Sequence, residues 1–231
     1  MNDSPPCFKF SCETVICDLL MVEIMDGIHS FDFSESKNHG MELWFLDCPE
    51  GIVLVDTGMG DEVLGMVEAE LGSLGKGWGD VKIVLITHRH GDHVRNLAKV
   101  KALTGAPVYC QAEEVLAIKE QTGVEPEDLA HGFSLPYCGG IEVIHVPGHT
   151  EGNCCYLLKE RGVLVAGDTV FGDEGGNIFE PPEKYCVDVE QATREIARLL
   201  DYDFDSLIYT HGRDVLAGAK EKVEALVERT R

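Results

Sequence analysis

Short apolar runs rich in Val, Ile and Leu recur along the chain, each with a Gly or Pro nearby. Runs of this length and composition are typical of buried strands. They predict strands at residues 52–55, 81–86, 141–146, 163–166 and 207–209. The apolar segment 41–46 is predicted to form a hairpin with residues 52–55, joined by residues 47–51.

Between these runs, apolar positions recur at the i, i+3 and i+4 spacing of amphipathic helices. This spacing predicts helices near residues 61–71, 94–103, 112–121, 189–200 and 215–229. The 231 residues are 44% hydrophobic and contain neither a Pro/Ser-rich linker nor an internal repeat. We therefore expect a single domain, residues 1–231, of the mixed α/β (α+β) class.

Side chains that commonly bind metals follow several of the predicted strands. The run 81–86 leads into His88-Arg89-His90-Gly91-Asp92-His93. Positions i and i+2 of an extended segment point the same way, so His88 and His90 can reach one ion together. Asp92 and His93 lie past Gly91, where the chain turns, and are aimed at a second ion. Three further candidates also follow apolar runs: His149, Asp168 and His211.

These motifs together resemble the metallo-β-lactamase superfamily. Its Thr-His-x-His-x-Asp-His motif stands at residues 87–93. The resemblance continues in the family's order through Val-Asp-Thr-Gly at 55–58, Pro-Gly-His-Thr at 147–150, Gly-Asp-Thr at 167–169 and His-Gly at 211–212. It implies an αββα sandwich, in which two sheets pack face to face with helices outside and metals at one edge.

The resemblance also implies a ligand set for two divalent ions, with zinc expected first and iron or manganese as alternatives. The first ion is implied on His88, His90 and His149. The second is implied on Asp92, His93 and His211. Asp168 would bridge the two ions together with a hydroxide. Asp56 would be a supporting carboxylate that orients the ligands.

The chemistry that follows is hydrolysis of an acyl bond in a small molecule, either a thioester, a lactone or another ester. A hydroxide held by the two metals would attack the acyl carbon, and Asp92 or a bound water would handle the proton. The chain looks most like the glyoxalase II branch. However, only 20 residues follow His211, which leaves no room for that branch's C-terminal helical domain. Phe171 stands where the similar acyl-homoserine lactonases carry a tyrosine.

Two other interpretations remain open. Persulfide dioxygenases resemble this chain but use a single iron, which His88, His149 and Asp168 would hold with open positions for oxygen. A non-catalytic member that keeps the fold is the third interpretation, although all seven candidate ligands are present. The ligand count favours two metals and hydrolysis.

Charge and cysteine content limit the binding partners and the cellular compartment that we expect. The net charge of −22 opposes binding to nucleic acid. No apolar stretch is long enough to predict a membrane span, and the N-terminus lacks a basic signal-peptide region. Nine cysteines without a Cys-x-x-Cys pair favour reduced thiols, so we expect a cytoplasmic protein. The sequence leaves a homodimer open.

Two glycine-rich and aromatic loops, residues 26–40 and 171–185, suit either a wall of the substrate pocket or an ordinary surface connection. Not every histidine is expected to belong to the metal site. Four of them are expected to be surface residues or hydrogen-bonded core residues: His29, His39, His131 and His145.

Overall fold

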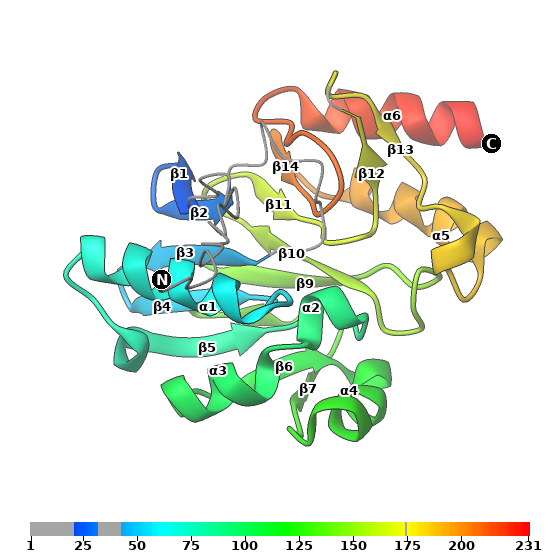
Figure 1. Cartoon of the computed structure of the whole chain (residues 1–231). Coiled ribbons are helices and arrows are strands. Elements are labelled where there is room, and N and C mark those ends of the chain that lie inside the picture. Colours follow the sequence, from blue (N-terminus) through cyan, green and yellow to red (C-terminus); the bar gives the residue numbers. More distant parts are fainter. Residues whose placement is uncertain (1–20, 32–42, 174) are drawn as a thin grey trace, which may run out of the picture.

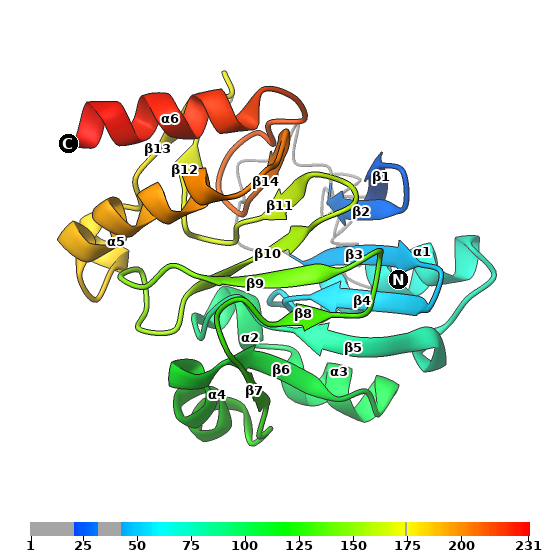
Figure 2. The same cartoon turned by 180° about the vertical axis from the view of Figure 1, so that it is seen from behind.

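The computed structural model describes residues 21–31, 43–173 and 175–231. Two β-sheets face each other, and helices cover both outer faces (Figure 1, and from behind in Figure 2). This is the αββα arrangement that the resemblance implies.

The first sheet has seven strands in the order of the sequence. They are β1 Met21–Met25, β2 Ile28–Phe31, β3 Trp44–Cys48, β4 Gly51–Val55, β5 Val81–Leu85, β6 Val108–Gln111 and β7 Glu127–Leu129. Strands β1 to β4 pair antiparallel, whereas β4 to β7 pair parallel. The parallel half brings the carboxyl ends of β4 and β5 to one edge.

The second sheet has five strands in the order β14-β11-β10-β9-β8. They are β8 Ser134–Leu135, β9 Ile141–His145, β10 Cys154–Leu158, β11 Val163–Val165 and β14 Ser206–Ile208. β11 and β14 are parallel, and β10 is antiparallel to both β9 and β11, so β9, β11 and β14 all run the same way. A small separate hairpin pairs β12 Phe171–Gly172 with β13 Ile178–Phe179.

The helices divide between the two outer faces. Buried side chains of α1, α3 and α4 pack on the first sheet, whereas those of α6 and the helical segment 196–201 pack on the second. The bounds are α1 Asp61–Ser73, α2 Gly91–Val94, α3 Leu97–Thr104, α4 Val115–Thr122, α5 Val189–Glu195 and α6 Ala219–Thr230. Short 3₁₀ helices lie at η1 Trp78–Asp80, η2 Ala112–Glu114, η3 Glu183–Tyr185 and η4 Ile196–Asp201.

Successive side chains of the strands face opposite sides of each sheet, so the buried apolar residues form three separate layers. Ile52 and Leu54 of β4 point outward toward α1, whereas Val53 and Val55 point into the space between the sheets. Tyr156 of β10 meets them there. Successive side chains of a strand point to opposite faces, so a strand that is apolar at every position must be covered on both sides. This explains why the central strands read as continuous apolar runs.

The predicted elements agree with most of these bounds. The hairpin turn is shorter than predicted, because β3 runs to Cys48 and β4 begins at Gly51; residues 41–42 lie outside the described residues. The helix predicted from residue 215 begins at Ala219 instead. Val215 pairs with Leu207 in a β-bridge, and Gly218, with a φ of 68°, turns the chain into the helix.

One prediction from composition is wrong in part. Cys48 and Cys138 form a disulfide across 90 residues, with their Cα atoms 4.8 Å apart. The pair joins the end of β3 to the turn before β9. No local spacing of cysteines in the sequence predicts this disulfide. Four other cysteines are free thiols, as expected: Cys110, Cys154, Cys155 and Cys186. The remaining three, at 7, 12 and 17, lie outside the described residues.

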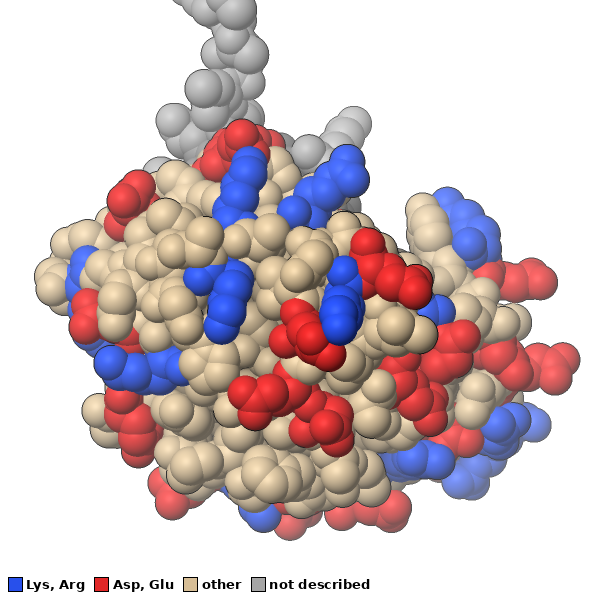
Figure 3. All heavy atoms as spheres, turned by 90° about the horizontal axis from the view of Figure 1, so that it is seen from below, with Lys and Arg blue, Asp and Glu red and all other residues tan. Residues whose placement is uncertain are grey.

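Charged side chains of both signs are interspersed on the face drawn in Figure 3, where basic residues stand among acidic and uncharged ones. Within residues 21–31, 43–173 and 175–231, none of the helices combines the length and the hydrophobicity needed to cross a bilayer.

Candidate metal centre

The candidate ligands lie just past the carboxyl ends of strands or on the short helix that follows one. His88 and His90 follow β5, and Asp92 and His93 are on α2. The other three follow β9, β11 and β14 in turn: His149, Asp168 and His211. The shared direction of these strands within each sheet places their ends at one edge of the sandwich.

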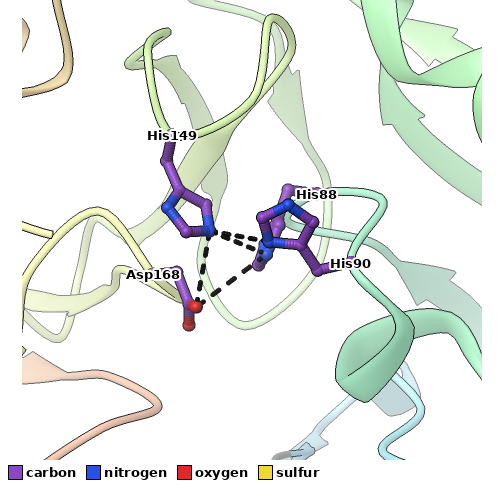
Figure 4. A group of neighbouring side chains, drawn as sticks. All are labelled: His88, His90, His149 and Asp168. Atoms are coloured by element: carbon purple, nitrogen blue, oxygen red, sulfur yellow. Dashed lines mark hydrogen bonds and ion pairs between the residues drawn. The ribbon is translucent and has the colours of Figure 1, made fainter. Parts of the chain in front are cut away.

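Three imidazole nitrogens converge in a first group, which Figure 4 shows with Asp168 beside them. His149 Nε2 lies 2.9 Å from His90 Nδ1 and 3.2 Å from His88 Nε2. The same His149 atom lies 3.4 Å from Asp168 Oδ2. One ligand atom from each of these four residues lies within 4.8 Å of the others, close enough for all to bind one ion.

A second group adjoins the first and shares Asp168. The sharing is direct, because Asp168 Oδ1 is 3.3 Å from His93 Nε2 while Oδ2 faces His149. Asp92, His93 and Asp168 likewise bring one ligand atom each within 4.8 Å of the others. His211 Nε2 lies 3.4 Å from Asp168 Oδ2 and 3.8 Å from Asp92 Oδ2. All seven predicted ligands therefore meet in one place, in two groups around a common carboxylate.

Asp56 lies directly behind the second group and is fully buried. Its Oδ1 accepts a 2.8 Å hydrogen bond from the Thr87 backbone N–H, and Oδ2 accepts one of 2.7 Å from the Thr87 hydroxyl. Oδ2 also lies 2.7 Å from His93 Nδ1. A carboxylate there holds the proton on Nδ1 and turns Nε2 toward the other ligands.

The residues present fit a bound cation. His93 Nε2 and Asp168 Oδ1 are buried and have no hydrogen-bond partner among the described residues, although they face each other. Buried polar atoms in folded proteins are normally paired, so two such atoms facing one centre indicate a missing ligand. Imidazole and carboxylate are ligands that zinc, iron and manganese accept.

The pKa values of His88 and His149 agree with this interpretation. Burial lowers the pKa of His149 to about 3, and it holds the pKa of His88 well below its usual range with the neighbouring imidazoles adding to the effect. Neutral imidazole is the form that binds metals. Burial would also lower the pKa of His93, but the carboxylates of Asp56 and Asp168 outweigh it and raise that pKa well above its usual value. The second group therefore favours a positive charge.

A cavity of about 720 Å³ opens onto the ligands, and Asp92, Asp168 and His211 form part of its wall. The Phe171 ring stacks on His211, with ring centroids 4.6 Å apart. Tyr185 also lines the cavity. The loop 171–185 thus contributes to the pocket wall. Of the other loop, Ile28–Phe31 is the buried strand β2, and residues 32–40 lie outside the described residues.

A family model described as "Metallo-beta-lactamase superfamily" matches residues 44–211, which include all seven candidate ligands and Asp56. The chain belongs to the metallo-beta-lactamase superfamily. The resemblance seen in the sequence motifs is thereby confirmed.

Curated relatives of this superfamily member include proteins named hydroxyacylglutathione hydrolase. One from Rhizobium meliloti (strain 1021) is 32% identical over 145 residues, which cover 62% of this chain and 52% of the relative. Another from Bdellovibrio bacteriovorus is 29% identical over 168 residues, which cover 71% of this chain and 60% of the relative. The chain spans about half the length of the curated relatives it matches.

Solved structures show the same superfamily fold. A metallo-beta-lactamase from Pontibacter korlensis superposes with a TM-score of 0.73 at 22% identity, covering 91% of this chain and 99% of that one. A metallo-beta-lactamase family protein from Thermus thermophilus gives a TM-score of 0.64 at 24% identity, covering 82% and 74% of the two chains. At these identities the likeness concerns the fold alone.

The histidines that sequence reasoning set aside lie away from the ligand groups, as far as the structure describes them. His29 is buried and its Nδ1 lies 2.7 Å from Glu70 Oε1. His131 Nδ1 accepts a bond from the His145 backbone N–H, and His145 Nε2 lies 2.8 Å from the Glu151 carbonyl oxygen. His39 lies outside the described residues.

Sequence reasoning missed two residues that support the ligands. Cys186 lines the cavity, with its Sγ 3.7 Å from His149 Nδ1. Glu114 is fully buried and bonds backbone N–H groups beside the ligands. Neither residue belongs to a motif, and Glu114 lies in a segment that reads as an ordinary helix start. Only contacts between distant segments reveal them.

Proposed function

We propose that this chain is a metal-dependent hydrolase that holds two divalent ions and cleaves an acyl bond of a small molecule. The observation that carries the proposal is the convergence of seven metal-ligand side chains in two groups that share Asp168. A single ion needs about four ligands, so seven are enough for two ions that share one carboxylate.

In this proposal His88, His90 and His149 hold the first ion, and Asp92, His93 and His211 hold the second. Asp168 would be shared by the two, and zinc is the expected metal. When bound, such ions polarise an acyl carbonyl and lower the pKa of a water molecule to near neutrality.

The chain's own residues supply orientation and proton handling. Asp56 keeps His93 Nε2 turned toward the ligands through its contact with Nδ1. Asp92 is the candidate catalytic proton acceptor, because its side chain is 25% exposed and lines the cavity next to the ligands. A carboxylate in that position can take a proton from water and return it to the leaving group.

Thioesters are the first substrate class to test, followed by lactones and other esters. The curated relatives are named for hydrolysis of hydroxyacylglutathione, which is a thioester. Phe171, Tyr185 and Val187 give the cavity an apolar wall suited to an acyl chain. The net charge of −22 supports a small-molecule substrate over a nucleic acid.

The test begins with elemental analysis of protein purified without a histidine tag, and continues with a screen of thioesters and lactones. Two zinc or manganese ions per chain, with turnover that a chelator abolishes, is the expected result. A single iron with no second metal taken up on titration would overturn the proposal in favour of oxygen-dependent sulfur chemistry. Metal without turnover of any acyl substrate would leave a metal-binding protein of this fold.

A further inference from the structure

Glu114 is a charged residue with no solvent exposure, at the end of the 3₁₀ helix η2 that follows β6. Its Oε1 accepts a 2.7 Å hydrogen bond from the Gly152 backbone N–H. Its Oε2 accepts one of 3.1 Å from the Arg89 backbone N–H. The Arg89 guanidinium completes the set, with Nη1 3.3 Å from Oε1. A buried carboxylate is stable only when it is paired and hydrogen-bonded in this way.

The two backbone donors belong to the two segments that carry the first ligand group. Arg89 stands between His88 and His90, in the segment that leaves β5 of the first sheet. Gly152 stands three residues after His149, in the turn between β9 and β10 of the second sheet. One carboxylate therefore connects ligand segments that come from different sheets.

We propose that Glu114 is a positioning residue that fixes the segment of His88 and His90 relative to the segment of His149. The inference rests on the proposed metal centre, and it concerns the first ion alone. Glu114 bonds the backbone beside the ligands and no ligand side chain, so it acts through the placement of the two segments.

The close approach at Gly152 supports this role. A Cβ atom on Gly152 would lie 2.6 Å from Glu114 Cγ and 2.7 Å from Gln111 Oε1. Such distances are below any normal contact, so the His149 turn reaches the carboxylate only because residue 152 has no side chain. Arg89 adds an outer connection on the same side, because its guanidinium also pairs with Glu151.

The second ligand group is held differently. Its residue His93 is held by Asp56, which follows β4, whereas Glu114 follows β6 on the other side of β5. The carboxylate of Glu114 bonds Arg89 and Gly152, both of which flank ligands of the first group. Loss of Glu114 should therefore affect the two ions unequally, whereas a general loss of stability would affect both.

The test compares Glu114→Gln with Glu113→Gln, which removes the same charge from the neighbouring exposed position of η2. In E114Q one carboxylate oxygen becomes an amide donor that faces donors, so at least one connection breaks. We expect zinc affinity at the first site to fall about 10- to 100-fold, the range seen when residues that support ligands are lost. Competition with a chromogenic chelator measures both sites, and the visible spectrum of bound Co²⁺ reports the geometry of the first. Affinity at the second site, and both affinities in E113Q, should stay unchanged.

Amide hydrogen exchange in metal-free protein gives a readout that needs no ion. The amides of Arg89 and Gly152 should exchange faster in E114Q than in wild type and stay protected in E113Q. Unchanged exchange and unchanged zinc affinity in folded E114Q would overturn the inference, as would an equal loss at both sites. Wild-type protein that binds no metal would instead refute the proposed function, and the exchange result would still decide whether Glu114 holds the two segments.

If E114Q does not fold, Arg89→Gln provides a second variant, since the Arg89 side chain is 19% exposed and its loss leaves the Gly152 bond intact. The same selective loss at the first site is expected from it, to a smaller extent. An equal loss at the two sites in R89Q would count against the inference.

Discussion

Cys48 and Cys138 join the two sheets where β4 and β9 begin, whereas Asp56 and His149 stand where the same two strands end. At the first end the connection is a covalent bond. At the second end, buried polar atoms of His93 and Asp168 face each other without hydrogen bonds. The disulfide end needs no ligand, whereas the side chains at the histidine end could bind a cation between them. The two ends should therefore respond to different perturbations.

The largest expected effect comes from removing a ligand at the histidine end. His90→Ala should lose metal from the first group and lower kcat/KM for the best acyl substrate more than about 100-fold, beyond the loss that supporting residues cause. His90 is only partly buried, so the variant should fold. Metal content and turnover measured on the same sample check this. His131→Ala, at an exposed histidine, is the matched control, and H90A with full activity would count against the dinuclear hydrolase.

The next effect belongs to the disulfide end and should leave the ligands untouched. Replacing Cys48 and Cys138 together by Ala should lower the free energy of unfolding by about 2–4 kcal/mol, because the bond closes a long loop in the unfolded chain. Urea denaturation measures the change. Zinc affinity should match that of wild type. The double variant should also no longer respond to a reductant, and a loss of metal binding in it would show that the two ends are coupled.

A smaller effect is expected from the residue behind the second group. Asp56→Asn keeps the shape of the side chain but presents an amide to Thr87 and His93, so His93 Nε2 loses its fixed orientation. Zinc affinity at the second site should fall about 10- to 100-fold, and that of the first site should fall less, because Asp56 reaches His88 only through the Thr87 hydroxyl. This is the reverse of the selectivity expected for E114Q. Asp61→Asn, at a side chain that is 84% exposed, serves as the control. Equal affinities in D56N and D61N would refute the role of Asp56.

The ligands were predictable because each follows an apolar run along the sequence. His88, His149 and Asp168 need no tertiary information beyond the expectation that strand ends share an edge. The supporting contacts were not predictable in this way. Glu114 bonds Gly152 across 38 residues, and Cys48 bonds Cys138 across 90. Such pairings depend on how the two sheets are stacked.

Some secondary-structure elements were also hard to predict from the sequence alone. Strand β10 is buried at every position, so its apolar residues show no alternation that would separate a strand from a core helix. Val215 continues a helical pattern in the sequence but pairs with Leu207, because Gly218 delays the helix. The prediction of a single domain over residues 1–231, and those of a homodimer and a cytoplasmic location, stay predictions.

The smallest effect is the contribution of the buried histidines to the pH dependence of stability in the metal-free protein. Burial holds the pKa values of His88 and His149 below the unfolded value, so between their folded pKa values and about 6.5 the unfolded chain binds more protons. Stability then falls as the pH falls, by about 1.4 kcal/mol for each such histidine between pH 7.5 and 5.5. His93 has the opposite sign, because its raised pKa adds stability below about 6.5, and it offsets one of the two.

His90, whose pKa is lowered, and Asp214, whose pKa burial raises to about 7, also titrate in this range, so the contribution of one histidine is measured by comparing variants in urea denaturation at the two pH values. His149→Asn should remove a loss of about 1.4 kcal/mol on acidification relative to wild type. The C48A/C138A variant should keep it in full, since the disulfide does not titrate and lies at the other end of β9. A His149→Asn variant with the same pH dependence as wild type would show that His149 is charged in the folded state. The cluster would then have to release protons before it could bind an ion.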